Sequence, residues 1–166
     1  MRSKILGLLL AVSLGLNCFL GYELVSGSRD TTARGISAYN STIGQFQMAL
    51  SLLNPDQQTN PRSPLRDRVI QASSALRAAQ FSLDFFRVSP RPGRKVPFTG
   101  PLIDRLGRAS WDLSGRLTGL ITEADKSGYL DDNQVKEIAV QIKTLLNDIP
   151  LTISTGKELQ DALRKS

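Results

Sequence analysis

Residues 63–87 read SPLRDRVIQASSALRAAQFSLDFFR, and this stretch decides the fold class. Ser63 is a favoured N-cap, and Pro64 suits the first helical position because its missing donor would have no partner there. The helix must end before Pro90. Its apolar residues recur at alternating spacings of four and three, the stripe of a helix that packs on another helix. The stripe consists of Leu65, Val69, Ala72, Leu76, Ala79, Leu83 and Phe86.

Three further stretches carry the same periodic pattern. Asn54-Pro55 ends the first, because the residue before a proline avoids the α region, and Pro150 ends the last. A short additional segment begins at Thr155, where Glu158 completes a capping box ahead of Leu159 and Leu163. The three stripes are Ile36, Tyr39, Ile43, Phe46, Leu50 and Leu53; Leu102, Leu106, Ala109, Leu113, Leu117 and Leu120; and Val135, Ile138, Ile142, Leu145 and Ile149.

Loops separate these helices, at residues 54–62 and at the proline-rich stretch 89–101. Four amphipathic helices joined by short or medium loops predict an all-α, up-and-down antiparallel four-helix bundle with a short C-terminal helix. The third helix contains Gly107, Gly115 and Gly119, each of which weakens it by about 1 kcal/mol relative to Ala. A close neighbouring backbone would explain these glycines, so we expect a tight helix crossing there.

The N-terminal segment predicts a membrane anchor. Arg2 and Lys4 precede an apolar run from Ile5 to Tyr22, and about 20 residues span a hydrocarbon core of roughly 30 Å. Positive charge stays on the cytoplasmic side, so we expect the N-terminus inside and the rest of the chain outside. The predicted organisation is a signal anchor at 1–27, a tether at 28–35 and an extracytoplasmic bundle domain at 36–166.

Two other fates of this segment remain open. A cleaved signal peptide is the first, since Val25-Ser26-Gly27 offers small residues before Ser28. Lipid attachment at Cys18 is the second, although Asn17 stands where bacterial lipidation favours a small residue.

Small residues recur every four positions along the predicted span, at Gly7, Ala11 and Gly15. This spacing matches the pattern by which transmembrane helices approach each other closely. It predicts membrane-helix contacts and a homodimer through the span. The alternative is that Gly and Ala are simply common in such helices.

The residue inventory excludes several classes of enzyme. The chain has no His and one Cys, Cys18, which removes zinc sites, Ser-His-Asp triads and Cys-His pairs. Neither a phosphate-binding loop nor a dinucleotide-binding glycine fingerprint is present in the sequence. We therefore expect no catalytic residues and no cofactor.

Residues 123–134 resemble the loop of calcium-binding helix–loop–helix proteins. That loop places oxygens at positions 1, 3, 5, 7, 9 and 12, with Gly at 6 and an apolar residue at 8. Glu at the first position and a neutral Gln at the last depart from the pattern. The alternative is an ordinary helical hairpin, in which Gly128 ends one helix and Asp131 or Asp132 caps the next. The side chains that match the ligand positions are Glu123, Asp125, Ser127, Asp131 and Gln134.

Basic charge is concentrated in the middle of the chain. Residues 62–116 carry a net charge of +7, whereas residues 117–166 carry −2. The densest cluster is Arg87, Arg91, Arg94 and Lys95, which we expect to bind an anionic partner such as lipid headgroups or an acidic envelope polymer. Nucleic acid is not an expected partner of an exported domain. The alternative is a basic surface that only keeps the domain soluble.

The plan of a short cytoplasmic tail, one span and a helical bundle is similar to the extracytoplasmic bundles of bacterial chemoreceptors. It also resembles the helical, membrane-anchored N-terminal region of YpeB-type spore-germination proteins. Neither resemblance implies the role of any particular residue. The first implies a sensory, ligand-binding bundle, although hardly any chain remains on the cytoplasmic side to carry a signal.

Two function classes therefore remain open. The first is a non-enzymatic interaction or scaffold module of the cell envelope, whose partner could be another membrane protein. The second is a bundle that binds a ligand or ion between its helices. A filled core with an exposed basic patch would favour the first, and an apolar-lined cavity with convergent polar groups the second. Trp111 lies off its stripe, so it either covers a bundle edge or marks a binding surface.

Overall fold

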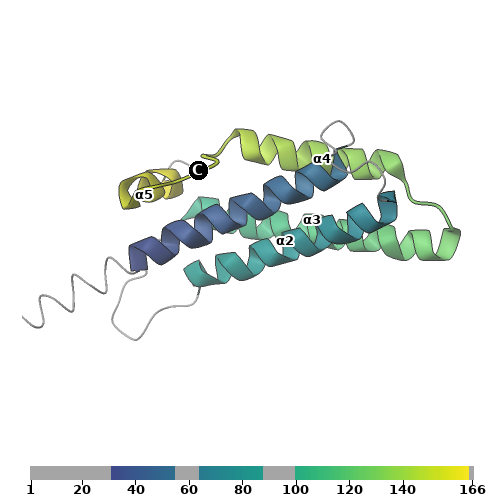
Figure 1. Ribbon diagram of the computed structural model, residues 1–166, viewed down its shortest axis with the longest axis horizontal. Coiled ribbons are helices and arrows are strands. Elements are labelled where there is room, and N and C mark those ends of the chain that lie inside the picture. Colours follow the sequence, from purple (N-terminus) through teal and green to yellow (C-terminus); the bar gives the residue numbers. More distant parts are fainter. Residues whose placement is uncertain (1–30, 55–63, 88–99, 165–166) are drawn as a thin grey trace, which may run out of the picture. The chain divides into compact units, whose positions relative to one another are not determined.

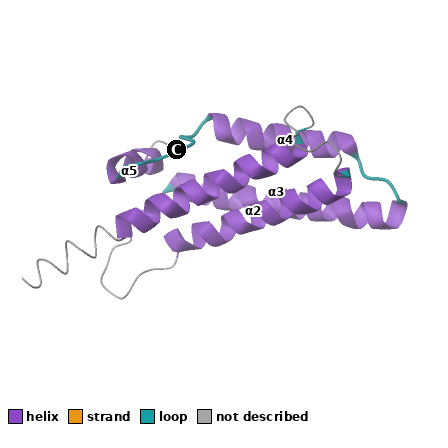
Figure 2. Ribbon diagram, viewed as in Figure 1, coloured by secondary structure: helices purple, strands orange, loops and turns teal. Residues whose placement is uncertain are grey.

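The computed structural model describes residues 31–54, 64–87 and 100–164, apart from the side chains of Phe85 and Arg87. The described residues from Gly35 onward belong to one compact unit, Gly35–Ser166. The described residues form helices, turns and loops and contain no strand (Figure 2). The prediction of an all-α fold is therefore confirmed for this part of the chain.

Five helical stretches lie within the described residues, and each predicted stripe falls in one of them, except that Ile149 follows the end of the helix Asp132–Asn147. The helix of residues 31–53 is followed by α2 (Leu65–Arg87), α3 (Pro101–Ser127), α4 (Asp132–Asn147) and α5 (Gly156–Arg164) (Figure 1). α2 begins at Leu65 rather than at Pro64, whose carbonyl accepts the first helical hydrogen bond from the Arg68 N–H (3.2 Å). α3 begins with Pro101 in the first turn.

The predicted stripes form the hydrophobic core of the unit Gly35–Ser166. Ile36, Leu50, Leu65 and Ala109 are the stripe members that pack against this core while remaining partly exposed. Burial of apolar surface at about 25 cal/mol per Å² makes the core the main stabilising feature. The largest fully buried side chains are Tyr39, Phe46, Phe86, Ile43, Leu53, Leu76, Leu83, Leu102, Leu106, Leu117 and Ile138.

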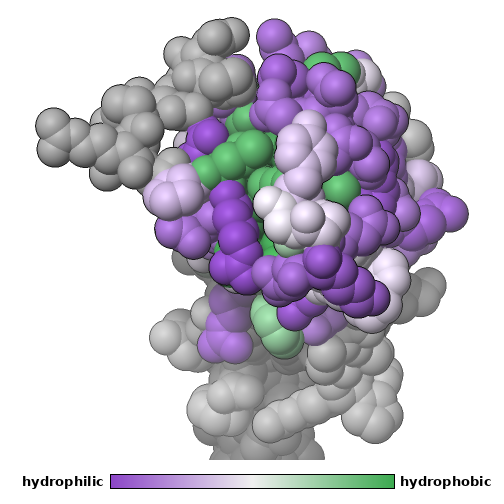
Figure 3. Space-filling model, turned by 90° about the vertical axis from the view of Figure 1, so that its right-hand side faces the viewer, coloured by the Kyte–Doolittle hydropathy of each residue, from purple (hydrophilic) through white to green (hydrophobic). Residues whose placement is uncertain are grey.

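Hydrogen bonds between neighbouring helices show that these helices pack in a bundle-like arrangement and run antiparallel. Along each seam, the residue number rises on one helix as it falls on the other. The bonded pairs are Ser41 with Ser82, Leu52 with Arg68, Arg66 with Asp125, Ser73 with Thr118, Arg105 with Asp148, and Arg116 with Gln141. Around the end of this unit near the α3–α4 turn, the surface is mainly hydrophilic with a limited apolar area (Figure 3).

The turn between α3 and α4 is a capped helical hairpin. Gly128 ends α3 in the left-handed conformation (φ 73°), and its N–H donates to the carbonyl of Ala124 at 2.8 Å. Asp131 caps α4, because its Oδ1 accepts the backbone N–H groups of Asn133 (2.9 Å) and Gln134 (3.3 Å). The hairpin interpretation of this stretch is confirmed, and Asp131 rather than Asp132 is the cap.

The expected tight crossing at the glycines of α3 is wrong for two of the three. Gly115 and Gly119 are exposed, and a Cβ built on either would meet no atom within 4 Å. Their spacing from the apolar stripe turns them outward, away from the neighbouring helices. The close approach occurs instead at Gly100, where an added Cβ would lie 2.6 Å from the carbonyl oxygen of Leu163 in α5.

None of the helices in the described ranges is both long and apolar enough to cross a membrane. The predicted anchor at 1–27 lies outside the described residues, together with Cys18 and the small-residue series Gly7, Ala11 and Gly15. The anchor and its contacts therefore remain predictions.

Candidate functional site

Two large aromatic side chains are exposed on adjacent helices. Phe81 of α2 is 77% exposed and Trp111 of α3 is 74% exposed. Both line one groove of about 580 Å³ between the two helices, together with Gln80, Asp84, Gly107, Arg108 and Asp112. Aromatic rings anchor many protein interfaces, because they bury a large area at little cost in conformational entropy. This groove is therefore a candidate binding surface.

Helical periodicity places Trp111 on the outside of α3. Ser110 and Leu113 face the core on either side of it, so Trp111 points into solvent. Trp111 was expected either to cover a bundle edge or to mark a binding surface, and its exposed position favours the binding surface. Phe81 was not predicted as a site residue, since the sequence cannot show that it shares a groove with Trp111. Its apolar character between stripe members Ala79 and Leu83 was the available signal.

A second groove follows the other side of α3, toward α4. It encloses about 340 Å³ and is lined by Arg105, Ala109, Asp112, Leu113, Val140, Gln141, Thr144 and Leu145. Val140 is exposed, and Asp112 lines both grooves. The outer face of α3 around Trp111 is therefore a ridge between two grooves, each with an exposed apolar side chain.

Arginines of the basic middle segment tie the helices together. Arg66 forms an ion pair with Asp125 at 2.7 Å, and Arg105 forms one with Asp148 at 3.0 Å. Arg116 lies 3.6 Å from Glu137 and donates to Gln141 at 2.7 Å. Three arginines of this segment are thus matched by acids along the helix seams. These pairs are solvent-exposed, so each contributes little to stability.

Arg108 and Asp112 differ from these arginines and acids. Within the described residues, neither side chain forms an ion pair or a hydrogen bond. Both are exposed, and they flank Trp111 on the ridge of α3. A cation and an anion thus stand one helical turn apart without partners beside an exposed indole ring.

The predicted anionic-partner cluster lies at the end of α2 and beyond it. Arg87 is the last residue of α2, and its side chain is not among those described. Arg91, Arg94 and Lys95 fall outside the described residues. Their role as a contact for lipid headgroups or an acidic polymer stays a prediction.

The residues that match a calcium loop have other partners in the fold. Asp125 pairs with Arg66, and the Ser127 hydroxyl donates to the Glu123 carbonyl at 2.9 Å. Asp131 caps α4 and also accepts the Gln134 side-chain amide at 3.0 Å. These bonds hold the Asp131 pKa below its usual range, with the Gln134 side chain as the largest cause. In the described parts of the chain, no three His, Cys, Asp or Glu residues converge as metal ligands.

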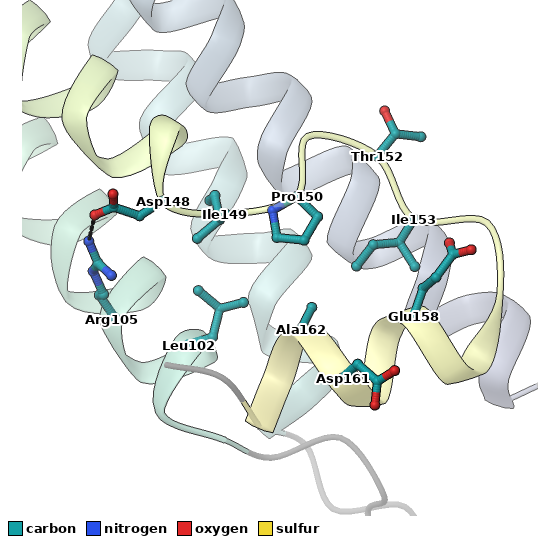
Figure 4. A pocket seen from close by; sticks show the side chains of 10 residues that line it. All are labelled: Leu102, Arg105, Asp148, Ile149, Pro150, Thr152, Ile153, Glu158, Asp161 and Ala162. Atoms are coloured by element: carbon teal, nitrogen blue, oxygen red, sulfur yellow. Dashed lines mark hydrogen bonds and ion pairs between the residues drawn. The ribbon is translucent and has the colours of Figure 1, made fainter.

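A pocket lies beneath the segment that joins α4 to α5 (Figure 4). It encloses about 500 Å³, with an apolar lining from Leu102, Ile149, Pro150, Ile153 and Ala162. Its polar lining residues are Arg105, Asp148, Thr152, Glu158 and Asp161. The Arg105–Asp148 ion pair lies on one side, and the two acids of α5 lie on the other (Figure 4).

The wall of this pocket is fixed by the helix of residues 31–53. The Tyr39 hydroxyl donates to the Pro150 carbonyl at 2.8 Å, and burial raises the pKa of Tyr39 to about 12. The Asn40 amide forms two further bonds to the backbone of Ile153. Glu158 accepts the Ser154 N–H at 2.8 Å and that of Thr155 at 3.3 Å, and these bonds, Ser154 first, hold its pKa below the usual range. The expected capping box of α5 is thereby confirmed.

The buried apolar side chains of the described helices form one core cluster. The buried polar side chains among the described residues are Thr42, Ser73, Ser110 and Ser114, and each forms a hydrogen bond. The Arg68 Nε is the one buried side-chain nitrogen or oxygen in the described ranges without a partner. No protein-family model, curated protein or solved structure matches this chain.

Proposed function

We propose that this protein is a membrane-anchored interaction or scaffold protein of the cell envelope, with no enzymatic activity. In this proposal an up-and-down four-helix bundle stands outside the cytoplasm behind a single N-terminal transmembrane helix. The sequence supports the anchor through Arg2, Lys4 and the apolar run that follows them. The observation that carries the interaction role is the pair Phe81 and Trp111, exposed in one groove.

Exposure of two aromatic side chains is unfavourable in free energy. Each large ring that stays in water lacks the stabilisation of about 1.5–3 kcal/mol that burial of the side chain would give. Nearly complete exposure is frequent for Lys or Glu but uncommon for Trp and Phe. Contiguous apolar area rimmed by polar groups is typical of interaction sites. Here the rim consists of Gln80, Asp84, Arg108 and Asp112.

The test is affinity capture of envelope proteins from membranes by the tagged full-length chain. Trp111→Ala and Phe81→Ala should each lower the captured amount of the same partner proteins by at least about tenfold, as expected for central interface residues. Tyr129→Ala is the matched control, because Tyr129 is also a highly exposed aromatic residue but lies in the α3–α4 turn. A captured set that is unchanged in both groove variants would contradict the assignment of this surface.

The location of the protein can be tested independently. The full 18.2 kDa chain should stay in the membrane fraction after a carbonate wash. A soluble product that begins at Ser28 would indicate a cleaved signal instead. That result would leave the interaction role of the exported domain unchanged.

Anionic contact by Arg87, Arg91, Arg94 and Lys95 is part of the same proposal. Binding to anionic vesicles or to purified envelope polymer should weaken with salt, because the Debye length falls from about 10 Å at 0.1 M to about 3 Å at 1 M. A fourfold Ala variant should lose this salt-dependent binding. If that variant bound as well as the wild type, the cluster would serve only to keep the domain soluble.

A ligand-binding role is the second candidate, and the pocket under the α4–α5 segment favours it. Its apolar lining and convergent polar groups have the composition of many small-molecule sites. Asp161 and Glu158 would favour a ligand with a cationic group. Screening envelope extracts for compounds that raise the melting temperature of the wild type, but not of Ala162→Trp, would test it. Failure to find such a compound at saturating extract concentrations would count against this role.

A further inference from the structure

The ridge of α3 is complementary to itself, and we propose that a second copy of this chain packs on it in antiparallel orientation. Arg108 of each copy then meets Asp112 of the other, with the two Trp111 rings between them. This inference rests on the proposed interaction function and names the partner of that surface. It is separate from the predicted contact between transmembrane helices.

Charge is the first observation behind this pairing. Residues four apart on a helix share one face, so Arg108 and Asp112 lie on the same side of α3. Two antiparallel copies of such a helix reverse the order of charges, so one twofold axis creates two reciprocal ion pairs. Arg66, Arg105 and Arg116 find acids within the unit, whereas Arg108 and Asp112 have none among the described residues.

Shape is the second observation. Trp111 projects from a ridge with a groove of about 580 Å³ on one side and one of about 340 Å³ on the other. Gly115 lies one turn after Trp111 and adds no side-chain bulk to the ridge. A Cβ at Gly115 would meet no atom within 4 Å, so this side of α3 has room for the indole ring of a second copy.

Symmetry joins the two observations. In a twofold contact, each patch must receive the features that it presents. The ridge carries one large ring and one charge of each sign. The groove beside it can receive the ring of the second copy, and each of its charges can pair with the opposite charge of that copy. The flanking Phe81 and Val140 extend the apolar area on both sides of the ridge.

Other occupants fit this ridge less well. An anionic membrane surface would meet the carboxylates of Asp84 and Asp112 beside Trp111. A strongly basic peptide would meet Arg108, and a strongly acidic one would meet Asp112. A surface with charges of both signs around an aromatic ring is complementary to a partner that carries the same set of groups. A second copy of this chain carries that set.

The test is charge exchange in the full-length chain in detergent micelles, with self-association followed by sedimentation. Arg108→Asp and Asp112→Arg should each weaken self-association by at least about tenfold, because like charges then meet twice across the axis. The double exchange should restore association. An equimolar mixture of the two single variants should also associate, since each supplies the charge that the other lacks. Lys126→Asp, a charge reversal near the exposed end of α3, is the matched control and should associate as the wild type does.

Fluorescence gives a second readout, because Trp111 is the only tryptophan in the sequence. Its emission should shift to shorter wavelength as the wild-type concentration rises, and it should not shift in either single variant. Emission that responds to anionic vesicles but not to protein concentration would overturn the proposal in favour of a membrane contact.

Three sedimentation results would also overturn the proposal. The first is a wild type that stays monomeric, and the second is a pair of single variants that associate as tightly as the wild type. The third is a mixture that fails to recover, which would place the effect of the charges within one chain. The broader interaction role would stand or fall separately, on whether Trp111→Ala loses proteins in the capture experiment.

Discussion

The side-chain amide of Asn40 pairs with the backbone of Ile153, which lies 113 positions further along the chain. Nδ2 donates to the Ile153 carbonyl at 2.8 Å, and Oδ1 accepts the Ile153 N–H at 3.0 Å. Ile153 is buried and belongs to the segment between α4 and α5, where no helix satisfies these backbone groups. One amide side chain thus replaces the hydrogen bonds that a neighbouring strand would supply, and it fixes a wall of the pocket.

Asn40→Ala should destabilise the protein, because it leaves both backbone groups of Ile153 without their partner. The expected loss is about 1–3 kcal/mol in the free energy of unfolding, the typical cost of stranding buried polar groups. Chemical denaturation of the purified protein measures it. Asn133→Ala is the control, since that side chain is exposed, and it should change the free energy by less than about 0.5 kcal/mol.

Ionisation of Tyr39 should lower the stability of the protein at alkaline pH. Burial raises its pKa from 10.0 to about 12, so the folded protein holds the phenolic proton more tightly than the unfolded chain does. The corresponding stabilisation is complete below about pH 10 and is lost as the pH rises toward about 12. Ionisation would also remove the proton that Tyr39 donates to the Pro150 carbonyl.

Melting temperatures of wild type and Tyr39→Phe across this alkaline range isolate the effect. The wild type should be the more stable at neutral pH, by about 0.5–1.5 kcal/mol for one hydrogen bond. The difference should narrow as the pH rises. A difference that stays constant up to about pH 12 would be incompatible with the raised pKa.

Two Gly→Ala substitutions should change the stability of the protein in opposite directions. At Gly100 the new methyl group would lie 2.6 Å from the Leu163 carbonyl oxygen, so α5 would have to move away and stability should fall. At Gly119 the methyl group meets no atom, and the helix should gain about 0.5–1 kcal/mol because Ala favours the helical state. Thermal melting of both variants distinguishes the two sites. A loss at Gly119 as large as that at Gly100 would indicate a neighbour that this fold does not place there.

Truncation of an apolar side chain should be costly on the buried face of a helix and cheap on its exposed face. Leu76→Ala removes a fully buried side chain and should cost about 2–5 kcal/mol. Val140→Ala on the outer face of α4 should cost less than about 0.5 kcal/mol. Denaturant titration measures both, and similar losses at the two positions would contradict the assignment of inner and outer faces.

The sequence by itself determined the helices of the described chain and their inner faces. The spacing of Leu76 within its stripe, the cap at Asp131 and the capping box at Glu158 are all local patterns. They depend on residues within a turn or two of each other, whose relative positions follow from helical geometry alone. This is why the predicted stripes and the observed core agree.

Tertiary structure decided which surfaces face each other. The close approach of Gly100 to Leu163, the shared groove of Phe81 and Trp111, and the bond from Asn40 to Ile153 all join segments that are distant in the sequence. Helical periodicity gives the direction of a side chain around its own axis, but not the rotation and distance of the helix beside it. Packing of the complete core sets those two quantities, because close-packed side chains accept only a few relative positions of neighbouring helices.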